Sequence, residues 1–327
     1  MNNVMGRRVF GGAVLAGTGA LAFQQLLSTR HVTDRRKPMS RVAILYQPDY
    51  SHRLDRSLID GLRLFALDLG GKMVLLKPNL VEHIPGAAVN TDPRLIGAAA
   101  DAFLALGAKT VLVGEGPGHE RDTVLVLAET GLESELRDRR IRFVDLNREG
   151  VVKLPLKTGF TGLEYLWLPR TVLAADFVVS MPKIKTHHWA GVTLSMKNLF
   201  GVVPGIAYGW PKNLLHCKGI DRSILDINAA VPVHFVIADG IVAMEGNGPL
   251  QGSSRRLGRI VLSDDPVAAD FTCTRLMGLN PMRVNHLAQA AAFLGNGVSD
   301  RIVHLGEPLP RTVQPFAVLP EFAHLHT

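Results

Sequence analysis

The sequence predicts an α/β fold in which helices flank a mainly parallel, Rossmann-like sheet, with a second, smaller lobe. From Arg41 onward, short β-branched runs alternate with longer amphipathic stretches, a pattern typical of the crossover units that build parallel sheets. The composition agrees, because 47% of the 327 residues are hydrophobic and 20% are charged. Such a chain is neither disordered nor fibrous and can bury a large core.

Seven short runs are expected to be strands because β-branched and apolar residues dominate them. They are residues 42–46, 73–77, 110–114, 141–145, 177–181, 234–239 and 259–263. Six stretches have the apolar spacing of helices, namely residues 53–69, 94–106, 123–129, 222–230, 266–277 and 283–294. Asp92 before Pro93, and Asp265 before Pro266, place a capping side chain ahead of a proline in the first helical turn.

The N-terminal segment, residues 1–40, is predicted to be an export signal with a basic linker. Arg7 and Arg8 precede a weakly apolar, Gly- and Ala-rich run that ends in a small-x-small triplet at residues 20–22. The arginine pair resembles a twin-arginine signal, although Gly6 stands where Ser or Thr is preferred. The run is too short and too rich in glycine for a stable membrane span. We therefore expect transport to the periplasm by the twin-arginine export machinery, with the signal either cleaved or kept as an anchor. The alternative is a chance arginine pair on an N-terminal helix.

The rest of the chain is expected to form one α/β domain over residues 41–305, with a lobe boundary near residue 220, and a C-terminal tail over residues 306–327. Six basic side chains and one acid lie in residues 1–40, so most of the formal net charge of +7 comes from that segment. The residues after position 40 are nearly neutral, so they do not provide the basic surface that nucleic acid requires. Two cysteines are too few to hold an iron–sulfur cluster. P-loop, GxGxxG, HExxH and GxSxG motifs do not occur.

Polar side chains cluster just after several predicted strands, where parallel sheets bind their ligands. These side chains are Lys77, His119, Lys183, Lys185, His187, Asp239 and Glu245. We expect them to converge on one cleft, with His119 and His187 facing each other across a substrate-sized gap. The lysines would bind a carboxylate or a phosphate. For any one of these residues alone, an ordinary solvated loop side chain is the alternative.

Five segments together resemble the bacterial and archaeal family named domain of unknown function 362. They read KPNL at 77–80, KIKTH at 183–187, TLSMKNLFG at 193–201, DGI at 239–241 and MEGNGP at 244–249. The resemblance covers most of residues 41–305, and the family name implies no reaction. Many relatives carry cysteine-rich ferredoxin segments that this chain lacks, so the resemblance implies no iron–sulfur cluster here.

A second resemblance, to the nickel-dependent lactate racemases, implies a chemistry. The sequence HHWAG at 187–191, a lysine at 197 and Pro-Gly at 204–205 are similar to a racemase segment, and the loop around His119 is similar to a Thr-His-Arg loop of that family. The resemblance implies that His119 and His187 are an acid–base pair, that Lys197 holds a nickel pincer nucleotide covalently, and that His216 binds the nickel. Asn198 follows the lysine where the racemases are apolar.

Two hypotheses of function follow. The first is an exported enzyme that acts on a small anion, such as a hydroxy acid, by His-mediated racemisation or isomerisation. Its catalytic set would be Lys77, His119 and His187, and its cofactor would be held by Lys183, Lys185, Lys197, Asn198, Asp239 and Glu245, with His216 on the metal. Imidazole titrates near neutrality, and a buried lysine becomes nucleophilic. The second hypothesis is a non-catalytic protein of the cell envelope that binds or matures a metal or nucleotide.

Overall fold

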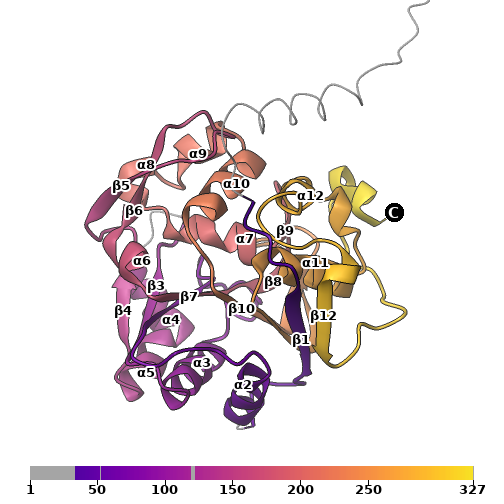
Figure 1. The fold of residues 1–327 in the computed structure, drawn as a ribbon, viewed down its shortest axis with the longest axis horizontal. Helices are drawn as coiled ribbons and strands as arrows, with labels where there is room; N and C mark the ends of the chain where they lie inside the picture. The colour runs from indigo at the N-terminus through magenta and orange to yellow at the C-terminus, as the bar shows by residue number, and fades with distance from the viewer. Residues whose placement is uncertain (1–33, 52, 119–121, 327) are drawn as a thin grey trace, which may run out of the picture.

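A computed structural model describes residues 34–51, 53–118 and 122–326 of the chain. Its centre is a ten-stranded sheet (Figure 1). The strands of this sheet are β1 (Ser40–Tyr46), β2 (Met73–Pro78), β3 (Thr110–Glu115), β4 (Arg142–Asp145), β7 (Phe177–Met181), β8 (Lys183–His187), β9 (Gly191–Thr193), β10 (Phe235–Glu245), β11 (Ser253–Ser263) and β12 (Ile302–Gly306). They follow the order β12-β1-β11-β10-β7-β2-β3-β4, and β8 lies between β10 and β9.

The sheet is mainly parallel, as predicted. Strands β10, β7, β2, β3 and β4 pair in parallel, and so do β1 and β12. β11 runs antiparallel to both of its neighbours, β1 and β10. All seven predicted strands belong to this sheet, so the alternation of short apolar runs identified the strands that form most of it.

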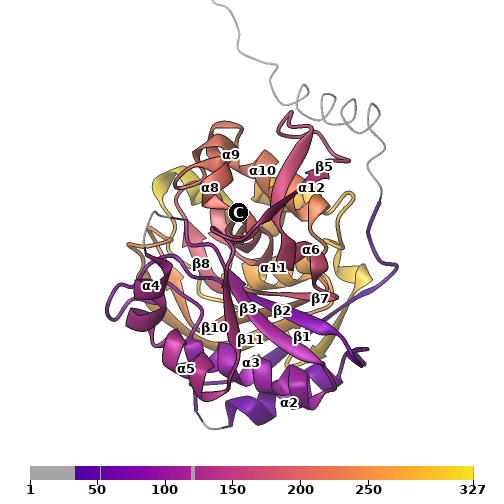
Figure 2. The same ribbon diagram turned by 90° about the vertical axis from the view of Figure 1, so that its left-hand side faces the viewer.

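Helices cover both faces of the sheet (Figures 1 and 2). One face carries α2 (Leu54–Arg63), α3 (Pro93–Ala105), α4 (Thr123–Thr130) and α5 (Leu132–Asp138), whose buried side chains form one apolar cluster with the strands. The other face carries a second apolar cluster. Its helices are α6 (Arg170–Ala174), α7 (Ser195–Asn198), α8 (Gly205–Tyr208), α9 (Asn213–Cys217), α10 (Ile220–Ala230), α11 (Pro266–Leu276) and α12 (Asn285–Ala290).

Smaller elements complete the second face. A hairpin of β5 (Val151–Pro155) and β6 (Tyr165–Pro169) lies apart from the main sheet. The 3-10 turns are η1 (Leu199–Val202), η2 (Pro281–Arg283), η3 (Ser299–Arg301) and η4 (Pro320–His326). The predicted lobe boundary near residue 220 falls at the start of α10, whose buried residues share one apolar cluster with those of α7 and α11. That boundary remains a prediction.

Capping side chains begin two helices where the sequence placed them. Asp92 accepts a hydrogen bond from the Arg94 backbone N–H at 3.0 Å, and proline follows it at the first turn of α3. Asp265 accepts from the backbone N–H groups of Val267 and Ala268 at the start of α11. These bonds satisfy N–H groups that have no partner within the helix.

Some predicted elements differ from the structure. Residues 183–187 were expected to form a loop, but they are the buried strand β8, which pairs with β10 and β9. The predicted helix over residues 53–69 is shorter, since α2 ends at Arg63 and Ala66 has a φ of 47° that a helix does not contain. Residues 306–327 had been assigned to a tail, yet Phe316 in that segment is fully buried.

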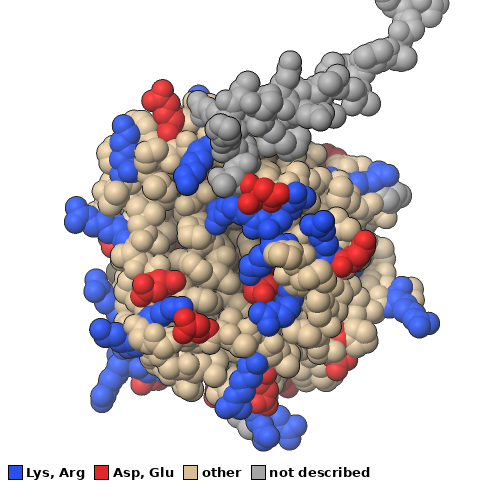
Figure 3. All heavy atoms as spheres, viewed as in Figure 1, with Lys and Arg blue, Asp and Glu red and all other residues tan. Residues whose placement is uncertain are grey.

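The described part of the basic linker is docked on the domain. Arg35 donates to the carbonyl oxygens of Asn228 and Ala229 at the end of α10, at 3.1 and 3.0 Å. Arg36 pairs with Asp34. On the face drawn in Figure 3, acidic side chains lie among the basic ones. Within the described residues, no helix has the length and apolar character needed to cross a membrane. The predicted signal lies outside those residues.

Candidate functional site

A cavity of about 230 Å³ lies beyond the carboxyl ends of β2 and β3 and is bordered by β8, α7 and α9. This is where parallel α/β sheets bind ligands. Among the described residues, its lining holds the four lysines Lys77, Lys185, Lys197 and Lys212 but only one carboxylate, that of Glu115. Amines therefore outnumber carboxylates in this lining, which suits an anionic ligand.

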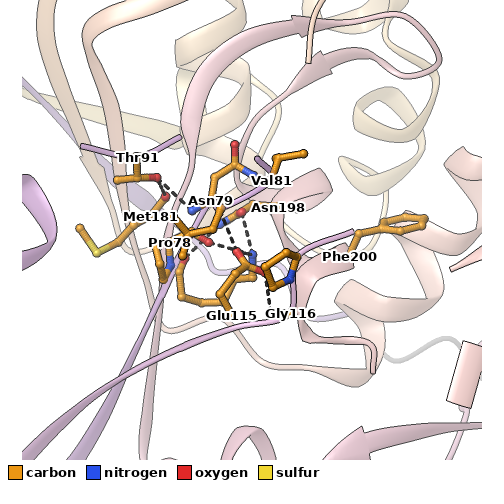
Figure 4. Close-up of polar contacts among 12 residues, drawn as sticks. Pro78, Asn79, Val81, Thr91, Glu115, Gly116, Met181, Asn198 and Phe200 are labelled. Carbon is orange, nitrogen blue, oxygen red and sulfur yellow. Dashed lines mark hydrogen bonds and ion pairs between the residues drawn. The ribbon is translucent and has the colours of Figure 1, made fainter. Parts of the chain in front are cut away.

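The buried ion pair of Lys77 and Glu115 lines the cavity, and we call it the floor. Figure 4 shows the polar contacts around Glu115 and Asn198. The Lys77 ammonium donates to Glu115 Oε2 at 2.5 Å, to the Pro78 carbonyl at 2.8 Å and to Asn198 Oδ1 at 2.9 Å. An ammonium group has three N–H donors, so these three acceptors use all of them. Burial lowers the pKa of Lys77, and the negative charge of Glu115 opposes that effect. Lys77 therefore holds other groups in place and has no N–H left for a ligand.

Glu115 and Asn198 are equally occupied. The Glu115 carboxylate also accepts from the backbone N–H groups of Leu80 at 3.1 Å and Gly116 at 2.9 Å. The Asn198 amide donates to the Lys77 carbonyl and to Ser180 Oγ, both at 3.1 Å. The pair and the amide thus tie the ends of β2 and β3 to α7, and they fix the shape of the cavity.

Three cavity lysines have no carboxylate partner among the described residues. Lys185 Nζ donates to the Val89 carbonyl at 2.7 Å, and burial lowers its pKa well below the usual value. Lys212 Nζ donates to two carbonyls. Burial lowers the pKa of Lys212 to about 7 and that of Lys197 to about 8. Burial makes these lysines lose charge more easily than exposed ones, and a bound anion would favour their charged forms.

A row of rings lines one wall of the cavity. The rings of His187 and His188 lie 4.9 Å apart, and Trp189 lies 4.8 Å from His188 and 5.2 Å from His216. The row ends at Phe200, whose ring lies 5.3 Å from His216. Lys197 Nζ sits 4.2 Å from the centre of the Phe200 ring, within the range of a cation–π contact. This wall combines one flexible amine with flat apolar surfaces.

The hydrogen bonds of His187 define its tautomer. Its Nδ1 accepts from the backbone N–H groups of Trp189 at 3.0 Å and Ala190 at 3.3 Å, so Nδ1 carries no proton. Burial, followed by the charge of Lys197, holds the pKa of His187 well below its usual value. The ring is therefore neutral, with its proton on Nε2, and acts as a hydrogen-bond donor.

His216 has the opposite arrangement. Its Nδ1 lies 3.1 Å from the Lys212 carbonyl, which can only accept, so Nδ1 carries the proton. Nε2 is then left with a free lone pair, the form in which imidazole binds metals. Burial lowers the pKa of His216, which keeps the ring neutral. Within the described ranges, no group of three His, Cys, Asp or Glu side chains is placed to hold a metal ion.

The structure brings six of the predicted site residues to this cavity and leaves three elsewhere. Lys77, Lys185, His187, Lys197, Asn198 and His216 line it. Lys183 instead pairs with Asp239 at 2.6 Å, in contact with the Tyr50 hydroxyl. Glu245 binds Arg255 at 2.6 Å. His119 lies outside the described residues, so its pairing with His187 stays a prediction.

Sequence reasoning did not select Lys212 and gave Glu115 no role. Glu115 is the last residue of β3, directly ahead of Gly116. Lys212 follows Pro211 in a segment with no recognised motif, and only the tertiary structure brings it to the cavity. A search for lysines in mainly apolar surroundings would have included it.

Comparisons with known proteins identify relatives. The family model described as domain of unknown function (DUF362) matches residues 74–275. The chain is 32% identical, over 246 residues, to the thylakoid-associated protein sll1697 of Synechocystis, and the match covers 71% of this chain and 74% of that protein.

Two solved structures are also similar. The lactate racemase apoprotein of Thermoanaerobacterium thermosaccharolyticum has a TM-score of 0.38 and 17% identity, covering 68% of this chain and 54% of that one. A protein of Thermotoga maritima has a TM-score of 0.35 and 15% identity, covering 61% of this chain and 53% of that one. This chain thus spans about half the length of each solved structure. Because the family model matches more than half of the 327 residues, the chain belongs to the domain of unknown function 362 family.

Proposed function

We propose that the protein is an enzyme that binds a small, hydroxy-acid-like anion in this cavity and racemises or isomerises it. The observation that carries the proposal is the excess of lysines, since Lys185, Lys197 and Lys212 have no carboxylate partner among the described residues. Burying amines in this way costs stability unless an anion or a catalytic task requires it. A purely structural cluster would pair each lysine, as Glu115 pairs Lys77.

Each free polar group of the cavity has a separate role in this proposal. Lys185 would bind the carboxylate of the ligand by a charge-assisted hydrogen bond, and Lys197 would do so in protein that carries no covalently attached group. The Nε2–H of His187 would donate to a second oxygen of the ligand, because its Nδ1 is already used by backbone N–H groups. An uncharged lysine amine of the cavity would accept the proton that leaves the substrate carbon.

The racemase resemblance implies a nickel pincer nucleotide, and the cavity residues fit a covalently held group better than a bare metal ion. The Lys197 amine has a pKa of about 8 because it is buried, so it is nucleophilic enough for a covalent link. His216 offers one free imidazole nitrogen. Such a group, when bound, would take a hydride from the substrate carbon. Lys197 would anchor it and His216 would contact its metal.

Covalent attachment gives a direct prediction. Protein purified from its native host should carry extra mass on the peptide that contains Lys197, because this amine is the one that the resemblance assigns to the cofactor. Intact-mass measurement followed by peptide mapping checks it, and the peptides with Lys185 and Lys212 serve as internal controls. Active protein with an unmodified Lys197 would rule out the pincer cofactor and leave anion binding as proposed.

Anion binding should weaken as the pH rises above about 7. In the empty cavity, burial gives Lys212 a pKa of about 7 and Lys197 a pKa of about 8, and a bound carboxylate would favour their charged forms. Binding therefore takes up protons. For lactate or oxalate, which stay ionised throughout, we expect the affinity to fall by up to about tenfold per pH unit for each lysine that must gain a proton.

Isothermal titration calorimetry at pH 7, 8 and 9, in two buffers of different ionisation enthalpy, measures both the affinity and the protons taken up. The Lys212→Met variant should reduce the uptake, whereas Lys218→Met, which removes an exposed lysine on the same segment, should leave it unchanged. An affinity that stays constant from pH 7 to pH 9 would contradict the proposed role of these lysines.

We also infer export by the twin-arginine route, on the support of Arg7 and Arg8 in the sequence. Replacing both by lysine should stop transport to the periplasm, because Lys is a poor substitute where the planar guanidinium is recognised. Cell fractionation followed by immunoblotting checks it. Undiminished periplasmic protein from the double-lysine variant would exclude this route.

A further inference from the structure

Lys212 stands apart from the other cavity lysines in its backbone and its surroundings. Its φ is 69°, a left-handed conformation that non-glycine residues rarely adopt and that clusters at functional sites. The side chain is only 2% exposed. Its Nζ donates to the carbonyls of Gly116 at 2.7 Å and Phe200 at 3.0 Å. Two separate segments of the chain thus hold one amine at the cavity wall.

The number of hydrogen bonds that Lys212 Nζ donates determines what remains for its lone pair. An uncharged amine has two N–H donors and one lone pair, and the two carbonyls accept both donors. The lone pair is then left without a hydrogen-bond partner among the described residues, on a side chain that lines the cavity. Burial favours this uncharged form, and so does the positive charge of Lys77 and Lys197, while Glu115 and Asp145 oppose it. The amine is buried and contacts two carbonyl oxygens and no carboxylate among the described residues.

We propose that Lys212 is a nucleophile that forms an imine with a small 2-oxo acid bound in the cavity. The inference rests on the proposed function, because Lys185, Lys197 and His187 would bind the carboxylate of that acid. The Lys212 lone pair attacks the carbonyl carbon, and the carbonyl oxygen leaves as water with both amine protons. The imine nitrogen then takes one proton from solvent, and the N–H formed in this way can donate to one backbone carbonyl. No oxidant or reductant is needed.

The chemical class follows from the surroundings of the amine. The carbonyl group is expected beside a negative charge, because the other free donors of the cavity are lysine amines, an imidazole N–H and the hydroxyl of Thr193. A 2-oxo acid places its carboxylate next to its carbonyl carbon and is small enough for a cavity of about 230 Å³. It is also the oxidised counterpart of a 2-hydroxy acid, the substrate class of the proposed enzyme.

Reductive trapping tests the inference on the full-length protein. The protein is incubated at pH 7 with pyruvate and sodium cyanoborohydride, which reduces an imine to a stable secondary amine. Peptide mapping should find one adduct, on Lys212, with the added mass of one pyruvic acid less one oxygen atom. Excess oxalate should prevent labelling. Lys212→Arg, which keeps the charge and can still donate to both carbonyls, should lose the adduct, and Lys218→Arg should keep it.

Other labelling results would overturn the inference. Labelling of Lys197 or Lys77 in place of Lys212, labelling spread over exposed lysines, or no labelling would each exclude Lys212 as the nucleophile. This conclusion does not depend on whether the arginine variant folds, because the label is mapped in the wild-type protein. Calorimetry with oxalate separates the two proposals: if oxalate binds but no adduct forms, the imine is excluded and the anion site remains.

Discussion

Glu115→Gln should lower the free energy of unfolding by about 3–5 kcal/mol, because it leaves the buried ammonium of Lys77 without its counter-charge. Both side chains of this pair are 1% exposed, so water cannot replace the lost carboxylate. The Gln side chain has one oxygen where Glu has two, so it can keep the hydrogen bond from the backbone N–H of Leu80 or of Gly116 but not both, and this lost bond adds to the effect of charge. Urea denaturation followed by circular dichroism measures the difference.

The double variant Lys77→Met with Glu115→Gln is the matched control. It removes both charges and should recover much of the loss, since exchanging a whole buried pair costs less than breaking it. A single variant that loses less than about 1 kcal/mol, or a double variant as unstable as the single one, would show that the pair is not the charge-balanced floor of the cavity.

Gly201→Ala should disrupt the Lys77–Glu115 pair by a steric clash. It should destabilise the protein by about 3 kcal/mol, the upper end of the usual range for overpacking. A Cβ at this position would lie 1.8 Å from Glu115 Oε1 and 2.4 Å from Lys77 Nζ. These groups are the ends of flexible side chains, but several hydrogen bonds hold both of them in place. We also expect oxalate affinity to fall at least tenfold.

Gly118→Ala is the control for Gly201→Ala, because Gly118 lines the same cavity and a Cβ there meets nothing within 4 Å. Its stability should stay within about 0.5 kcal/mol of the wild type. If Gly201→Ala binds oxalate as tightly as Gly118→Ala does, the ion pair does not shape the anion site.

The sequence predicted the sheet well because its strands are apolar and its helices begin at recognisable caps. Residues 177–181 are buried throughout, and such a run predicts a central strand without further information. Asp92 and Asp265 could be recognised as helix caps because each precedes a proline. This signal is local and needs no tertiary context.

Prediction failed where tertiary contacts outweigh local pattern. Residues 183–187 are polar, with two lysines and a histidine, yet all five are buried in β8. The polar side chains are compensated by distant partners, such as Asp239 for Lys183 and the Val89 carbonyl for Lys185. No pattern of neighbouring residues contains that information.

The positions of some site residues could be predicted from the sequence, but their roles could not. Lys77 and His187 were expected at the carboxyl edge of the sheet, because the rule for parallel sheets selects that edge, and both line the cavity. Their roles were less accessible. The three acceptors around the Lys77 ammonium make it a positioning residue, and backbone N–H groups make His187 a donor. Counting donors and acceptors requires coordinates.

The proposed enzyme moves hydrogen at the carbon that bears the hydroxyl group of a small 2-hydroxy acid. Incubation of the protein from its native host with single enantiomers of such acids in D₂O shows whether this reaction occurs. Chiral chromatography then follows the opposite enantiomer, and proton NMR follows the C2–H signal. We expect the opposite enantiomer to accumulate with wild-type protein and not with Lys197→Met. Loss of the C2–H signal would indicate proton transfer, and its retention would indicate hydride transfer. An unchanged enantiomer with every acid, despite measured anion binding, would contradict the enzyme and favour a non-catalytic binding protein.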